Sequence, residues 1–216
     1  MNESNSSTTD ITQPLSLQVQ DIHTSWIREM PNGELIEKLR ETPSSRASLS
    51  KFIKQYLPSN EIDDEDEITK QLLQHKPEDL HQLVLKAGAT QFSSKIRLII
   101  TKKAVISLKK SLGEDLYNFS LNEAPELSNE LESSVAQTFM EGIDPLSQVI
   151  NNGYKSLRLA LDDSPNNCIY KLPKEWNESY SSSESIDPKT KSDSGFHKTL
   201  ISRLINGETT NVDQLF

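Results

Sequence analysis

Apolar residues recur along most of the chain at the spacing expected of α-helices. Between Arg46 and Leu57 they follow the order i, i+3, i+4, i+7 and i+8, which places them on one face of a helix. The same period predicts helices over residues 21–29, 33–41, 46–57, 68–74, 77–100, 101–122, 127–142, 145–150 and 197–205. We therefore expect a mainly α fold with a single irregular helical domain.

Proline and glycine mark the predicted ends of several helices. Pro31, Asn32 and Gly33 separate the first two, because proline removes a backbone donor and glycine reverses the chain at little cost. Pro77 suits the first position of a helix, and two acidic residues follow it in the first turn, where they are favourable. The helix after Pro77 contains the small pair Gly88 and Ala89, which would allow another helix to cross closely.

The segment 101–122 predicts a helix with an apolar and a basic side. The residues expected to face inward are Val105, Ile106, Leu108, Leu112, Leu116 and Phe119. The basic side is expected to carry Lys102, Lys103, Lys109 and Lys110. The apolar residues recur on one side of a helix whose other side carries lysines. We therefore expect Leu112, Leu116, Tyr117 and Phe119 to be mostly buried.

In two segments the sequence pattern is compatible with either a strand or a helix. Residues 96–100 are rich in β-branched side chains, but the 3.6-residue period on both sides and the lack of a partner strand favour a helix. Residues 154–176 alternate apolar and polar positions, as in Tyr154, Leu157, Leu159 and Leu161. A short β-hairpin turning across 162–167 remains an alternative there.

The length of 216 residues fits one domain with small additions. Composition divides the chain into a Ser/Thr-rich extension at 1–13, expected to be disordered, and a helical domain over 14–176. A Ser-rich flexible linker is expected over 177–195, followed by a C-terminal helix within 196–216.

The charge of −9 is unevenly distributed along the chain. Six of the seven residues 61–67 are acidic, whereas residues 80–113 contain no acid and seven basic residues. A basic face for an acidic partner is therefore a hypothesis, and it consists of Lys95, Arg97, Lys102, Lys103, Lys109 and Lys110. The alternative is that the acidic run folds back over this face. A second candidate surface is the apolar C-terminal helix with Leu200, Leu204 and Phe216.

Motifs of catalysis and cofactor binding are missing from the sequence. The seven glycines are scattered, so neither a P-loop nor a dinucleotide fingerprint can be built. The four histidines form no ligand pair, and the acidic run lacks the spacing of an EF-hand, so we expect no metal and no cofactor. The basic segment has one arginine and one aromatic residue, which argues against nucleic acid as the partner. An enzyme is not expected.

The expected compartment is the cytoplasm. The sequence contains no run of 18 apolar residues, so it predicts no membrane span. The N-terminus lacks the basic and apolar regions of a secretory signal. The one cysteine, Cys168, permits no intramolecular disulfide, which fits a reducing compartment, and we expect it to be a buried, unreactive thiol.

Three stretches together resemble a bacterial family. They are Trp26 to Pro31, the central run of residues 83–121, and a late Leu-x-Leu-x-Leu at 157–161 that is followed by the Lys-Leu-Pro-Lys of 171–174 and the terminal LISRLI helix. In these stretches the chain resembles the K subunit of type III secretion machines, the SctK family of sorting-platform accessory proteins, also called OrgA/MxiK-like.

The resemblance implies a non-enzymatic cytosolic adaptor of the injectisome. Such proteins link the cytoplasmic domain of the inner-membrane ring protein to the cytoplasmic ring (pod) protein, and indirectly to the ATPase stator. It implies peripheral association with the inner-membrane base and no insertion into the membrane. The family has no catalytic residues to carry over. The alternative function is an acidic secretion chaperone for an effector or translocator client, although such chaperones are usually shorter, dimeric and α/β.

Overall fold

The computed structural model describes residues 17–57, 67–129, 138–162, 167–183 and 194–207. These residues are mainly helical and include no strand, which confirms the expected fold class. The elements are η1 (Val19–Asp21), α1 (Thr24–Arg28), α2 (Gly33–Leu39), η2 (Pro43–Ser45), α3 (Arg46–Ile53), α4 (Glu67–Gln74), α5 (Pro77–Ile96), α6 (Lys102–Leu112), α7 (Glu114–Asn122), α8 (Ala124–Asn129), α9 (Pro145–Ala160), η4 (Asn167–Lys171), α10 (Lys174–Ser183) and α11 (Ser194–Asn206).

The centre of the fold is the crossing of α5 and α9, which pack more extensively than any other pair of described helices. Gly88 on α5 lies against the backbone of Val149, and Gly153 on α9 lies against the backbone of Val84. A Cβ atom at either glycine would collide with the carbonyl oxygen opposite. The close crossing expected at Gly88 is therefore confirmed. Buried Gln91 joins the two helices by donating to the Ser156 hydroxyl at 2.6 Å.

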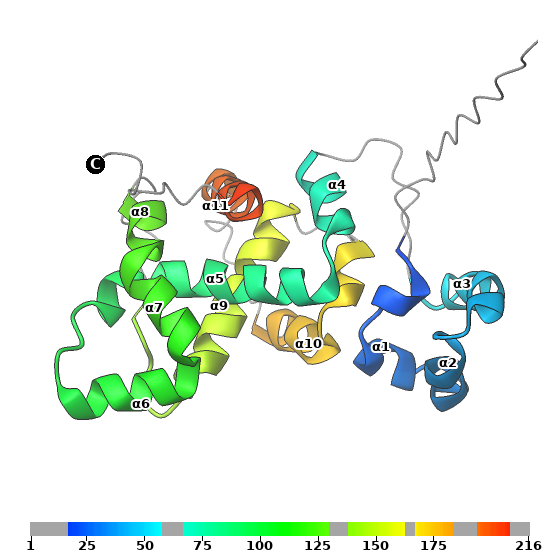
Figure 1. Ribbon diagram of the computed structural model, residues 1–216, viewed down its shortest axis with the longest axis horizontal. Coiled ribbons are helices and arrows are strands. Elements are labelled where there is room, and N and C mark those ends of the chain that lie inside the picture. The colour runs from blue at the N-terminus through cyan, green and yellow to red at the C-terminus, as the bar shows by residue number, and fades with distance from the viewer. Residues whose placement is uncertain (1–16, 58–66, 130–137, 163–166, 184–193, 208–216) are drawn as a thin grey trace, which may run out of the picture.

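Helices α6, α7, α8, α10 and α11 lie around this pair, whereas α1, α2 and α3 lie to one side of it (Figure 1). Helices α7 and α8 pack on α5, α11 packs on both α9 and α5, and α10 packs on α9. Helix α6 contacts α7 and α9 and forms one end of the elongated molecule, while α2 and α3 lie at the other end (Figure 1). Gly88 and Gly153 thus allow α5 and α9 to pack closely at the centre of the molecule. The two ends of the molecule lie on either side of this pair.

The N-terminal helices are attached to η4 and α10 by hydrogen bonds between residues far apart in sequence. The Trp26 indole donates to the Leu172 carbonyl at 2.9 Å, and the Lys174 amide donates to the Ser25 hydroxyl at 2.9 Å. Lys171, whose side chain is 3% exposed, donates to the carbonyls of Leu73 and His75 at 2.7 Å each and pairs with Asp21 at 3.4 Å. This buried cation therefore joins η1, the end of α4 and η4.

The hairpin alternative for 154–176 is wrong. Residues 145–160 form helix α9, which does not end at 151–153 as expected, and η4 and the start of α10 follow within the described residues. The alternating positions Tyr154, Leu157, Leu159 and Leu161 are all buried, because α9 is covered on several sides by α5, α10 and α11. A helix that is covered on several sides has apolar residues on more than one face, and its sequence can then alternate as in a strand.

Most of the other predicted helices also have different limits: the helix predicted over 46–57 ends at Ile53, and three further segments differ more. The segment 101–122 is two helices, since Gly113 at φ +82° interrupts it in a conformation that side chains other than glycine rarely adopt. The helix from Pro77 ends at Ile96 and not at 100, and Thr101 takes an extended conformation before α6 begins. The segment 127–142 contributes α8, which begins earlier, at Ala124; residues 130–137 lie outside the described part, and 138–143 are not helical.

The predicted linker of 177–195 is wrong over 177–183, which belong to α10. Apolar Tyr180 is buried in this helix and contacts Tyr154, so α10 has a core position that the Ser-rich composition hides. The C-terminal helix begins at Ser194 and ends at Asn206, before Gly207 at φ +64°. The predicted extension at 1–13, the remainder of the linker at 184–193 and residues 208–216 lie outside the described residues.

Candidate functional site

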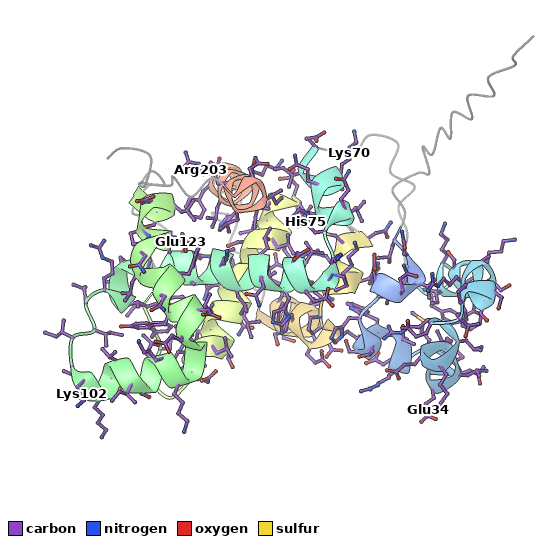
Figure 2. All side chains as sticks on the ribbon, viewed as in Figure 1. Glu34, Lys70, His75, Lys102, Glu123 and Arg203 are labelled. Atoms are coloured by element: carbon purple, nitrogen blue, oxygen red, sulfur yellow. The ribbon has the colours of Figure 1, made fainter. Side chains whose placement is uncertain are left out.

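The outward face of α6 is built from residues spaced by four. Lys102, Ile106 and Lys110 follow the order i, i+4, i+8 and therefore share one stripe, with Lys103 beside it. The three lysines are exposed to solvent. Leu108 and Leu112 lie on the opposite side and are buried, which fixes the rotation of the helix. Figure 2 shows Lys102 at the extreme end of the molecule, with its side chain directed away from the body.

Ile106 does not face inward as expected. Its side chain is 57% exposed and stands between Lys102 and Lys110 on the outer stripe. In the connection from α5 to α6, Leu98 is 71% exposed and Ile100 is 86% exposed. These large aliphatic side chains lie within the segment of 80–113 that has no acidic residue. We call Leu98, Ile100, Lys102, Lys103, Ile106 and Lys110 the α6 surface.

The six basic residues of the hypothesis are not equivalent in the structure. Arg97, Lys102, Lys103 and Lys110 are exposed, and Lys95 is half-buried. Lys109 pairs with Glu114 at 2.9 Å, and its ammonium lies 5.2 Å from the centre of the Tyr117 ring. Its positive charge is thus already engaged within the protein, so Lys109 contributes less to an outer surface than its neighbours.

The far end of α6 is fixed to the start of α9. The Ser111 hydroxyl donates to the Asp144 carboxylate at 2.7 Å and accepts from the Leu146 amide at 3.2 Å. Asp144 also accepts from the Ser147 amide at 3.0 Å as the N-cap of α9. The hydrogen bonds from Ser111 and Ser147 hold the pKa of Asp144 below its usual value. The exposed side chains of Met140 and Ile143 lie just before this junction.

The interior of the same region agrees with the prediction. Leu112, Leu116, Tyr117 and Phe119 are all buried, so the expected apolar core of α6 and α7 is confirmed. The ammonium of Lys86, another basic residue of the segment, lies over the Phe119 ring at 5.2 Å from its centre. Some of the positive charge of 80–113 therefore stabilises aromatic rings of the fold and is not displayed.

The C-terminal helix offers less surface than expected. Leu200 and Ile201 are fully buried against the body, and Leu204 is partly buried. Leu200 thus belongs to the core, because α11 packs on α9 and α5. Phe216 lies outside the described residues. The acidic run meets the described chain only at Glu67, the first residue of α4, and α4 contacts α11 and η4.

Other chemistry is sparse in the described part of the chain. Cys168 is buried, in agreement with the expectation of a core thiol. No three histidine, cysteine or carboxylate side chains gather there as ligands for a metal. None of the helices that the structure describes has both the length and the apolar character of a membrane span.

Comparison of the chain with known proteins finds no matching family model, no matching curated protein and no matching solved structure. The α6 surface is therefore the feature of the molecule that bears on its function. Sequence reasoning found its lysines from the gap in acidic residues, but it missed the exposed aliphatic side chains. Two signals were present: the β-branched run 96–100 had no partner strand, and Ile106 has the same helical spacing as Lys102 and Lys110.

Proposed function

We propose that this protein is a non-enzymatic adaptor that docks an acidic partner on the α6 surface. The observation that carries the proposal is the outer stripe of α6, where Ile106 stands exposed between Lys102 and Lys110. Exposed aliphatic side chains grouped with like charges are typical of interaction surfaces, because apolar area left in water is unfavourable. A partner helix or loop with apolar side chains flanked by carboxylates would complement the surface.

The resemblance to the SctK family supplies the identity of the partner in this proposal. The adaptor would link the cytoplasmic domain of an inner-membrane ring protein to the cytoplasmic ring protein of a type III secretion sorting platform. It would work in the cytoplasm, held peripherally at the inner-membrane base. A mainly α body with a charged, aliphatic end suits a role in assembly, since such a role needs surfaces and no reacting groups.

A pull-down with the two ring proteins tests this function. Lys102→Glu, Lys103→Glu and Lys110→Glu are combined in one variant, because these lysines are exposed and Lys109 is already paired with Glu114. The matched control combines Lys38→Glu, Lys51→Glu and Lys54→Glu, three exposed lysines at the opposite end with the same change in net charge. We expect the α6 variant no longer to bind the ring protein that docks on the α6 surface. The control variant should bind that ring protein as the unmodified chain does.

Salt provides an independent readout of the same contact. Exposed charges are screened over about 8–10 Å at physiological ionic strength, so binding should weaken as salt rises from about 0.05 to 0.3 M. Equal retention by both triple variants, with unchanged helical circular dichroism, would contradict the α6 surface as the docking site. Capture of a secreted client in place of the ring proteins would instead favour the chaperone alternative.

A further inference from the structure

Exposed aliphatic side chains accompany α6 from its start to its far end. Leu98 and Ile100 precede the helix, and Ile106 lies on its outer stripe. Met140 and Ile143 lie just before the junction of its last turn with α9. These are five of the seven large apolar side chains that are exposed in the described part of the chain. Exposed apolar surface is therefore concentrated around this one helix, as expected of an interaction surface.

The outer stripe of α6 has the form of a ridge. The helix has 11 residues, so it is about 16 Å long. Lys102, Ile106 and Lys110 form one i, i+4, i+8 row along it, and rows of this spacing fit into the grooves between the side-chain rows of another helix. Buried Leu108 and Leu112 fix the rotation of α6, so the row is presented without rearrangement.

A helix suits this ridge better than an extended segment does. The backbone groups inside α6 are bonded to one another, so the helix offers no free edge to which a strand could add. An extended segment that covered Ile100 and Ile106 would bury some of its own backbone groups without partners, which costs free energy. A helix brings apolar side chains to the same place and keeps its backbone hydrogen bonds.

The charge along the outer stripe of α6 is uneven. Arg97, Lys102 and Lys103 are exposed at its start. At its far end, exposed Lys110 is accompanied by the exposed acid Glu141. The net positive charge therefore lies at the start of α6, and carboxylates of a partner are most favourable there.

We propose that the α6 surface binds an amphipathic helix of the partner, about three turns long, whose aliphatic stripe packs along Ile106. Carboxylates of that helix face Arg97, Lys102 and Lys103. This inference rests on the proposed function, because that function places the partner on the α6 surface. It adds the secondary structure of the partner segment and the position of its charges.

Three peptides of about 15 residues test the contact on the full chain. The first contains Leu, Ala, Gln and Glu, with leucines at i, i+4, i+7 and i+11 on one face and glutamates in the first two turns. The second has the same composition, but its leucines are spread around the helix. The third keeps the leucines of the first and has glutamine at every glutamate. Each peptide carries fluorescein, and fluorescence anisotropy measures its binding.

We expect the first peptide to bind with a dissociation constant of about 0.1 mM, because a short peptide must become helical as it binds. The second should bind about tenfold more weakly, since its leucines cannot all meet the outer stripe of α6. The third should also bind about tenfold more weakly, because it lacks carboxylates for the basic start of α6.

Two exposed aliphatic positions provide a matched pair of variants. Ile106→Ser should weaken binding of the first peptide about tenfold, because it removes the centre of the outer stripe. Leu35→Ser, at a position that is 54% exposed on α2 at the opposite end, should leave binding unchanged. Circular dichroism melting checks the fold of both variants. If Ile106→Ser does not fold, the first two peptides on the unmodified chain still decide the matter.

Equal binding of the first two peptides, or equal effects of the two serine variants, would overturn the helical partner. Displacement of the first peptide by phosphatidylglycerol vesicles would also overturn it, in favour of an anionic lipid surface. The pull-down judges the proposed function separately. If the α6 variant no longer binds the ring protein while the first two peptides bind equally, the docking function stands and the helical partner fails. If the first peptide binds selectively while the pull-down is unchanged, the helix-binding surface stands and the ring protein is not its partner.

Discussion

The end of the molecule formed by α6 and the region where α1, η4 and α10 meet differ in shape and in the contacts that hold them. Helix α6 shows lysines and aliphatic side chains on an outer stripe, and buried Leu108 and Leu112 attach it to the body. The other region lines a cavity that is partly open to solvent, and it is held by hydrogen bonds of Trp26, Lys171 and Lys174. Figure 2 places Lys102 and Glu34 near the two extremes.

The difference shows how one small helical protein can present two kinds of surface. An outer surface with long lysine side chains acts on a partner at a distance, so it mainly raises the association rate. A cavity with fixed walls acts only on a group that enters it, so it mainly selects the partner and slows its release. The rigid α5–α9 crossing between them keeps both ends in place.

The largest effect on stability should follow from adding a side chain at the α5–α9 crossing. Gly88→Ala would place a methyl group against the Val149 carbonyl, so the two helices must separate. We expect a loss of about 3 kcal/mol or more in the free energy of unfolding, because a side chain pressed against backbone has no easy relaxation. Gly195→Ala, where the added methyl meets nothing within 4 Å, should be neutral or slightly stabilising. Urea unfolding measures both, and equal stability of the two variants would contradict the close crossing.

A smaller effect should separate the inner and outer sides of the α6 end. Leu116→Ala removes a buried side chain and should cost about 3 kcal/mol of unfolding free energy, within the usual range of about 2–5. Ile106→Ala, at an exposed position, should change the unfolding free energy by less than about 0.5 kcal/mol. Thermal melting compares them. If Ile106→Ala proved as destabilising as Leu116→Ala, then the outer stripe of α6 would be part of the core.

The smallest effect should be a pH dependence of stability that arises from the histidines near α1 and α10. Burial lowers the pKa of His23 and of His81, and the His81 ring packs 4.8 Å from the Trp176 ring. Because both groups bind protons more readily in the unfolded chain, stability is full above their unfolded pKa of about 6.5 and falls as the pH drops below it.

His81→Gln should therefore reduce the loss of unfolding free energy between pH 7 and pH 5, as measured by urea titration at each pH. His75→Gln is the matched control, because it makes the same substitution just beyond the end of α4. An unchanged slope in His81→Gln would mean that the acid sensitivity arises elsewhere in the molecule.

The helical fold class and much of the core could be predicted from periodicity alone. Leu112, Leu116 and Phe119 are buried as their spacing indicates, and Gly88 lies at a close crossing as its size indicates. Periodicity failed for α9, because a helix covered on several sides has apolar residues on more than one face. It also failed for α10, where the core position of Tyr180 depends on Tyr154 and not on neighbours in sequence.

The candidate sites could be predicted from the sequence less well than the fold. The missing acids of 80–113 pointed to the lysines of the α6 surface, but a pattern of apolar positions cannot say that Ile106 faces water. The cavity could not be foreseen at all. Its walls come from Trp26, Leu57, Arg158 and Tyr170, which only tertiary packing brings together.

The N-terminal helices are held by hydrogen bonds to residues far along the chain, and this affects the order in which the chain can fold. Trp26 bonds to a residue 146 positions later, and Ser25 to one 149 positions later. At a synthesis rate of about 5–20 residues per second, their partners are made roughly 7–30 s afterwards. Helices α1 and α2 have five and seven residues, too few to persist alone in water.

During that interval the apolar side chains of Ile27 and Met30, which are buried in the finished protein, have no core to enter. We therefore expect these early helices to pack only after α9 and α10 have been made. Contacts of such separation in sequence are slow to form, because the entropy of closing a long loop is lost before any contact compensates for it.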